Sequence, residues 1–133
     1  MAIQFSTAVR NARLDQIETT IGTSAVIRIF TGSPPANCAA ADSGTILATV
    51  NCPSDWMAAA SGGSKAKSGT WEDLSADNTG TAGYFRVYDS GVTTCHMQGT
   101  VGTSGTDMTV NSTSFTSGQP FTINTFTLTD GNA

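Results

Sequence analysis

The spacing of hydrophobic residues is helical at the start of the chain. Between Ser6 and Gly22, the residues Leu14, Ile17 and Ile21 recur at positions that fall on one face of a helix. Ser6 is a favourable N-cap, and Gly22 is favourable just past a helix C-terminus. The pattern predicts one helix with a narrow apolar stripe. Such a helix needs a partner, which is either the chain's own sheet or another protein.

From residue 24 onward the hydrophobic residues alternate with polar ones in short runs, separated by Gly, Ser and Pro. The alternation predicts strands at 25–31, 45–51, 69–73, 83–89, 92–100, 107–111, 113–116 and 121–129. Seven to eight short strands of this kind are typical of an antiparallel β-sandwich or a jelly-roll-like barrel, and we favour the jelly roll. We expect one structural unit, with an N-terminal helical arm at 1–23 and a β-sandwich domain at 24–133.

The segments between the strands carry their own signals. Residues 32–44 contain two consecutive prolines and predict a long loop, because proline cannot donate to a central strand. Residues 58–69 are small and polar, which predicts a flexible connection. The pair Ser90-Gly91 predicts a tight turn between two strands, which makes this segment the clearest hairpin of the chain.

The last predicted strand contains a change of parity. Phe121 and Ile123 share one face of a regular strand, whereas Phe126 and Leu128 share the other. A β-bulge near residues 124–125 would bring all four side chains to the same face, and we predict one there.

The composition supports a β-rich fold and excludes two classes of partner. Only 12% of the residues are charged, 22 are threonine and 14 are glycine. The net charge is −4 and the six basic residues are scattered, which argues against nucleic acid and against an anionic membrane surface. No apolar run approaches the length of a membrane span, and the first residues lack the features of a signal peptide. We expect a protein that is made in the cytoplasm and not exported.

Three cysteines, Cys38, Cys52 and Cys95, are an odd number at irregular spacing, which is a poor disulfide framework. We expect free thiols. A Cys38–Cys52 disulfide in an oxidising medium remains an open alternative.

Catalytic and metal chemistry find little support in the spacing. Cys95 and the single histidine, His96, are neighbours on a predicted strand, so their side chains point to opposite faces. Glu72 and Asp73 are adjacent carboxylates of the kind that glycoside hydrolysis uses in pairs, but on a strand their side chains also point to opposite faces. The sequence contains no C-x₂-C pair, in which two residues separate two zinc-binding cysteines. It also lacks the G-x-S-x-G motif that positions a nucleophilic serine. We expect no catalytic residue, no cofactor and no metal, with a small hydrolase built on His96 as a minor alternative.

Four aromatic residues, Trp56, Trp71, Tyr84 and Tyr88, have two interpretations. They pack in the core or at a subunit interface, or they form a platform on which sugar rings stack. The residues that we consider candidates for an interface combine these four with the helix stripe: Leu14, Ile17, Ile21, Trp56, Trp71, Tyr84 and Tyr88.

Several strings along the chain carry a family resemblance. They are Phe30–Ala36 (FTGSPPA), Gly80–Arg86 (GTAGYFR), Gly99–Met108 (GTVGTSGTDM) and Phe126–Ala133 (FTLTDGNA). With the opening helix, they resemble small structural proteins of tailed bacteriophages and prophages. These strings are turn and strand signatures, so the resemblance brings no catalytic residue with it.

The resemblance implies a virion component made in the bacterial host cytoplasm. A capsid decoration or cement protein is the function that we expect. It would be a homo-oligomer that binds the lattice of the major capsid protein and stabilises the head. The alternatives are a tail or connector protein and a fibre-associated module that binds a carbohydrate or receptor.

Overall fold

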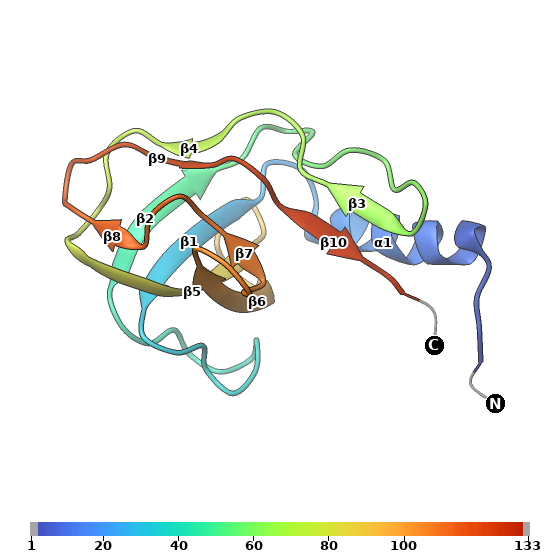
Figure 1. Cartoon of the computed structure of the whole chain (residues 1–133), viewed down its shortest axis with the longest axis horizontal. Helices are drawn as coiled ribbons and strands as arrows, with labels where there is room; N and C mark the ends of the chain where they lie inside the picture. Colours follow the sequence, from blue (N-terminus) through green and yellow to red (C-terminus); the bar gives the residue numbers. More distant parts are fainter. Residues whose placement is uncertain (1–2, 132–133) are drawn as a thin grey trace.

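Six strands form the main sheet in the computed structural model, which describes residues 3–131 (Figure 1). Across the sheet the order is β2 (Ile46–Asn51), β1 (Val26–Thr31), β5 (Gly80–Tyr88), β6 (Cys95–Gly102) and β7 (Met108–Thr109), and β8 (Ser114–Phe115) pairs with the start of β5. Neighbouring strands are antiparallel, except that β7 runs parallel to β6 over two residues.

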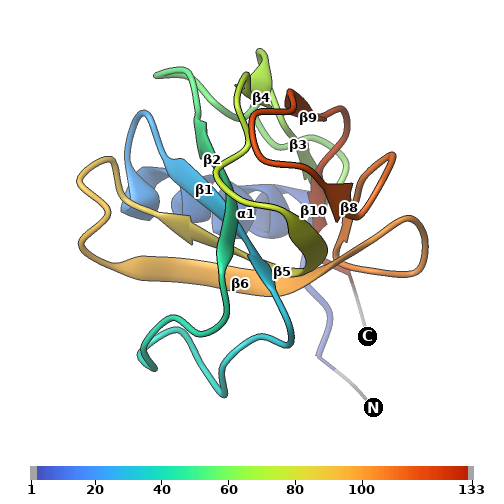
Figure 2. The same cartoon turned by 90° about the vertical axis from the view of Figure 1, so that its left-hand side faces the viewer.

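Two short strand pairs lie over one face of this sheet, as Figures 1 and 2 show. They are β4 (Trp71–Asp73) with β9 (Phe121–Ile123), and β3 (Ser64–Ala66) with β10 (Thr127–Thr129). The fold is therefore mainly β with one N-terminal helix, as the sequence predicts. Within residues 3–131 there is no closed barrel, and the arrangement is consistent with a β-sandwich. The described residues form ten short strands, where the sequence predicts seven to eight.

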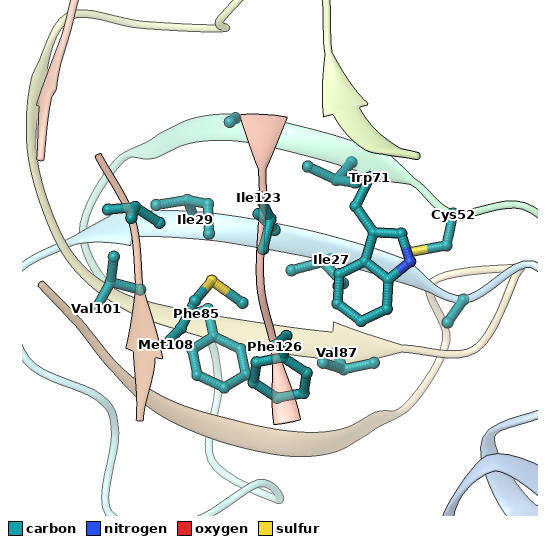
Figure 3. Packing of buried hydrophobic residues seen from close by; sticks show 14 of the residues in the cluster. Ile27, Ile29, Cys52, Trp71, Phe85, Val87, Val101, Met108, Ile123 and Phe126 are labelled. Carbon is teal, nitrogen blue, oxygen red and sulfur yellow. The ribbon is translucent and has the colours of Figure 1, made fainter. Parts of the chain in front are cut away.

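The hydrophobic core fills the space between the main sheet and the two strand pairs (Figure 3). Alternate residues of β1 and β5 face this space because successive side chains of a strand point to opposite sides. The strand pairs and the segment after β9 close it from above. Fully or almost fully buried members include Ile27, Ile29, Phe85, Val87, Trp71, Ile123 and Phe126.

The final predicted strand is broken in two. Its first half, β9, pairs with β4, and its second half, β10, pairs with β3. Ile123 and Phe126 both lie in the core, and Phe121 and Leu128 pack against it. The change of parity at 124–125 is therefore at the predicted place. A bulge within one continuous strand is wrong, however, because the chain leaves one strand pair there and joins the other.

The single helix, α1 (Thr7–Ile21), begins and ends where the sequence predicts. The Ser6 hydroxyl accepts a hydrogen bond from the Val9 amide at 3.2 Å, and Gly22, at φ 92°, donates to the Glu18 carbonyl at 2.9 Å. The helix packs on its own chain, so it does not project as a free arm.

The two ends of the described chain lie side by side next to α1 (Figure 1). The Arg13 Nε atom is 3.2 Å from a carboxylate oxygen of Asp130, and Arg10 donates to the Asp130 carbonyl at 3.1 Å. The structure does not describe residues 1–2 and 132–133. The end of the Phe126–Ala133 motif and both limits of the expected unit 1–133 therefore lie outside the described residues. No helix in the described part of the chain is long and apolar enough to cross a bilayer.

The hairpin between β5 and β6 is confirmed, but its connection is longer than the predicted two-residue turn. Tyr88 pairs with Cys95, which leaves six residues, 89–94, in the loop. One carboxylate oxygen of Asp89 accepts the amides of Thr93 and Thr94 at 2.8 and 2.9 Å, and the other accepts the Thr93 hydroxyl at 2.6 Å. These hydrogen bonds lower the pKa of Asp89 to about 2.

Because the pKa of Asp89 is lowered in the folded state, we expect the wild-type protein to lose stability in acid. We expect the Asp89→Asn variant to lose less stability over the same pH range. A carboxylate with a pKa of about 2 in the folded state, against 3.8 ordinarily, stabilises the fold above pH 3.8, and this stabilisation is lost as the pH falls toward 2. We expect the carboxyl carbon of Asp89 to titrate with a midpoint near 2 by NMR, and Asp89→Asn to flatten the acid limb of the melting-temperature profile. Asp55→Asn, at another exposed position, is the control. A midpoint near 3.8 would contradict the geometry of the loop.

Candidate functional site

Six of the seven residues considered as interface candidates are buried. The side chains of Trp56, Trp71 and Tyr84 are 0% exposed, and those of Tyr88, Leu14 and Ile21 are at most 5% exposed. Ile17 is half-buried against the core. Packing in the core, one of the two interpretations of the aromatic residues, is therefore confirmed. A sugar platform formed by Trp56, Trp71, Tyr84 and Tyr88 is wrong, because the chain itself covers these four side chains.

The two tryptophans are buried because they pack against each other at the centre of the core. Their ring centroids are 5.8 Å apart, and Trp71 also lies 5.6 Å from the Phe126 ring. The indole nitrogen of Trp56 donates to the Gly22 carbonyl at 2.9 Å, which attaches the end of α1 to the core. Both indoles therefore have a structural role.

The tyrosines are buried because residues 32–44, which we name the covering loop, lie over the outer face of the main sheet (Figure 2). The Tyr84 hydroxyl donates to the Ser43 carbonyl at 2.5 Å and accepts from the Ser43 amide at 3.0 Å. The Tyr88 hydroxyl donates to Asp42 at 2.6 Å. Burial, the hydrogen bond to this carboxylate and its negative charge together raise the pKa of Tyr88 well above its usual range.

Arg86 holds the covering loop in place. Its side chain is 2% exposed, and its terminal nitrogens donate to the Asn37 carbonyl at 3.1 Å, the Ala40 carbonyl at 2.9 Å and the Asp42 carboxylate at 2.8 Å. Two further hydrogen bonds, at 2.9 and 3.1 Å, go to the side-chain oxygen of Gln98 on β6. The planar guanidinium thus joins the loop to the sheet in one fixed geometry.

A second buried cation, Lys65, lies in the segment that the sequence predicts as flexible. Residues 64–66 form β3, and the Lys65 ammonium is 2.7 Å from Asp15 and 2.7 Å from Glu18, both on α1. Burial lowers its pKa, but the hydrogen bonds and charges of the two carboxylates outweigh this effect and raise it. The prediction of a flexible connection is wrong here, because a salt bridge to a helix some 50 residues earlier in the chain orders it.

The Lys65 cluster is a structural contact and has no free donor for a ligand. The three protons of the ammonium are taken by Asp15, Glu18 and the Ala58 carbonyl, which is 2.9 Å away. These residues line a hollow of about 480 Å³ at the end of α1. The hydrogen bonds from Lys65 and from the Ala60 amide lower the pKa of Asp15, so the pair is ionised at neutral pH.

His96 lines a shallow hollow of about 240 Å³ between α1 and β6, together with residues of the helix such as Arg13, Ile17 and Thr20. Among the described residues, none of those that line this hollow is a carboxylate, a cysteine or a serine. Cys95 lies near Arg86 instead, on the outer face of the sheet. Thr20 supplies a hydroxyl in this hollow, but none of the residues that line it is a carboxylate that could orient the imidazole.

A third hollow contains no charged side chain, and no metal-binding cluster is found among the described residues. A hollow of about 250 Å³ between β8 and β9 is lined by Phe115 and Phe121, whose ring centroids are 4.7 Å apart, and by neutral polar residues. Within residues 3–131, no group of three or more His, Cys, Asp or Glu side chains is arranged to hold a metal.

Exposed large hydrophobic side chains gather near the N-terminus. Ile3 is 78% exposed, Phe5 43% and Val9 42%, and the Phe5 ring contacts the Arg13 guanidinium at 5.1 Å. We name these three residues the N-terminal apolar patch. The sequence reasoning missed it, although the signal was present: all three lie outside the stripe that α1 uses to pack. Elsewhere in the described chain, only Leu74 is a comparably exposed large hydrophobic residue.

Comparison with protein-family models, curated protein sequences and solved structures finds no match to this chain.

Proposed function

We propose that this protein is a non-enzymatic virion protein that decorates the head of a tailed bacteriophage. In this proposal it binds the lattice of the major capsid protein as a homo-oligomer and stabilises the shell. The observation that carries the proposal is the N-terminal apolar patch, because the other large hydrophobic side chains of the described residues, Leu74 excepted, are buried or half-buried. The resemblance of the FTGSPPA, GTAGYFR and GTVGTSGTDM strings to phage structural proteins supports it.

The size of the patch suits repeated binding to a lattice. Burying a large apolar side chain contributes about 1.5–3 kcal/mol, so three such residues make one modest contact per chain. A homo-oligomer that engages several neighbouring capsid subunits multiplies such contacts without needing any new one. A capsid supplies these identical sites at fixed spacings.

The interior of the domain supports a role that depends on a fixed shape. Arg86 joins the covering loop to the sheet, and Lys65 joins α1 to β3, each through several charge-assisted hydrogen bonds. With these two contacts, the long loop and the helix have fixed positions relative to the core. A decoration protein requires this rigidity, because it binds by complementarity and carries out no reaction.

Two other functions were considered from the sequence, a tail or connector protein and a fibre-associated binding module. A tail or connector protein would use the same apolar patch and differs from a decoration protein in copy number. The fibre-associated module that binds a carbohydrate or receptor depended on exposed Trp56, Trp71, Tyr84 and Tyr88, and all four are buried.

Binding of the purified full-length chain to phage heads that lack it tests the patch. We expect the double variant Ile3→Ser, Phe5→Ser to bind at least about tenfold more weakly in co-sedimentation, because two apolar side chains no longer contribute their burial energy. Leu74→Ser is the matched control, since it removes a similarly exposed side chain in the turn after β4. Both variants should keep the melting temperature of the wild type.

Equal binding by the double variant and the wild type would contradict the role of the patch. Loss of binding in Leu74→Ser alone would place the contact at the turn after β4 instead.

A further inference from the structure

The three cysteines lie on opposite faces of the main sheet. Cys52 is 5% exposed and belongs to the core, where burial raises the pKa of its thiol to about 12. Figure 3 shows it beside Trp71. Cys38 lies in the covering loop, on the other face. All three thiols are free, and the alternative of a Cys38–Cys52 disulfide is wrong because the sheet separates these two residues.

Cys95 lies on the same face as the covering loop. It pairs with Tyr88 across β5 and β6, and side chains that oppose each other in a ladder share a face. The Tyr88 hydroxyl reaches Asp42 in the loop, so this face is the covered one. Burial and the neighbouring Cys38 raise the pKa of the Cys95 thiol to about 11, and the positive charge of Arg86 opposes this shift only in part.

The covering loop brings Cys38 to the same place. Arg86 donates to the carbonyls of Asn37 and Ala40, which flank Cys38 on either side. Cys38 and Cys95 therefore both lie beside the Arg86 side chain on the covered face, and Cys38 is one of the groups that act on the pKa of the Cys95 thiol. Two cysteines that are 57 positions apart in the sequence are thus held together by a buried cation.

We propose that Cys38 and Cys95 form a site of covalent modification that closes to a disulfide when the protein meets a small-molecule disulfide such as oxidised glutathione. Cys38 lies in a surface loop, and its thiolate attacks first. A bond forms between Cys38 and one glutathione sulfur, the glutathione disulfide breaks, and one reduced glutathione leaves with the proton from Cys38.

Cys95 completes the reaction. Its thiolate attacks the Cys38 sulfur, the Cys38–Cys95 bond forms, and the second glutathione leaves with the proton from Cys95. Overall the two protein thiols lose two electrons and two protons, and one oxidised glutathione becomes two reduced ones. The inference does not depend on the proposed function, because any route out of a reducing compartment exposes the pair to such an oxidant.

The disulfide would fasten the covering loop to β6. It closes a long segment of chain between residues 38 and 95, and cross-links over long segments restrict the unfolded state most in the chain-entropy description. The same loop shields Tyr84, Tyr88 and Arg86, so the cross-link would keep the outer face of the sheet closed.

The experiment exposes the folded full-length chain to oxidised glutathione and measures its intact mass. We expect the product to be lighter by two hydrogens, without bound glutathione, and to melt about 10 °C higher than the reduced protein. Cleavage before aspartate places Cys38, Cys52 and Cys95 in the separate peptides 15–41, 42–54 and 89–106, so the linked pair is identified directly. We expect 15–41 joined to 89–106.

Variants give the reaction order. Cys95→Ser should stop at a glutathione adduct on Cys38, and the control Cys52→Ser should oxidise as the wild type does. A stable glutathione adduct on the wild type, a link that includes peptide 42–54, or three thiols that stay reduced would each overturn the proposal. The measurement on the wild type decides the question even where a variant fails to fold.

Discussion

Arg86→Ala is expected to lower the free energy of unfolding by about 3 kcal/mol, because each buried acceptor that loses its donor costs about 1–3 kcal/mol. The side chain is 2% exposed and makes five hydrogen bonds, so alanine would leave two loop carbonyls and the Gln98 oxygen without their donor. The covering loop would then lose its main contact with the sheet. Denaturation by urea, followed by circular dichroism, measures the loss.

Two other substitutions serve as controls for Arg86→Ala. Arg86→Lys keeps the positive charge but not the planar fork, and we expect it to recover less than half of the lost stability. Arg28 lies directly opposite Arg86 on β1, and its guanidinium sits 5.5 Å from the Tyr88 ring. Because this contact is worth about 1 kcal/mol, Arg28→Ala should be much milder. Equal losses for Arg86→Ala and Arg28→Ala would contradict the anchoring role of Arg86.

Trp71→Ala is expected to cost about 3–5 kcal/mol of unfolding free energy, the range for deleting a large aromatic side chain from a core. Trp71 is 0% exposed and lies between the rings of Trp56 and Phe126. Its indole nitrogen also donates to the carbonyls of Trp56 and Ser68 at 3.1 and 3.2 Å. Alanine would leave a cavity where the strand pairs meet the main sheet.

Trp71→Phe separates packing from hydrogen bonding in this prediction. Phenylalanine fills part of the volume but cannot donate to the two carbonyls, so we expect a loss between those of the wild type and Trp71→Ala. Thermal and chemical denaturation of the three proteins gives the order. If Trp71→Ala stays within about 1 kcal/mol of the wild type, the core lies elsewhere.

The parts of the fold that the sequence predicts well are those with a strong local pattern. Strands β1 and β5 are recognised by runs of β-branched and aromatic residues, and Ser6 and Gly22 mark the ends of α1 by local chemistry. The parity change before Phe126 also reports a real interruption of the backbone. In each case the residues that determine the structure are close in sequence.

The parts that it misses depend on contacts between distant residues. The segment around Lys65 has no hydrophobic pattern. It forms β3 because it pairs with β10 and because Lys65 binds Asp15 and Glu18 on α1. From the sequence, Arg86 is expected to point outward into solvent. In the structure the covering loop buries it. The N-terminal apolar patch could have been predicted, because Ile3, Phe5 and Val9 lie outside the apolar stripe of Leu14, Ile17 and Ile21.

Copy number in purified virions tests the central claim most directly. Quantitative mass spectrometry, with the major capsid protein as the internal standard, counts the chains per particle. A decoration protein that follows the capsid lattice should be present on the order of hundreds of copies. A count of about six to twelve would contradict this account and place the protein in the tail or connector, and absence from the virion would contradict both.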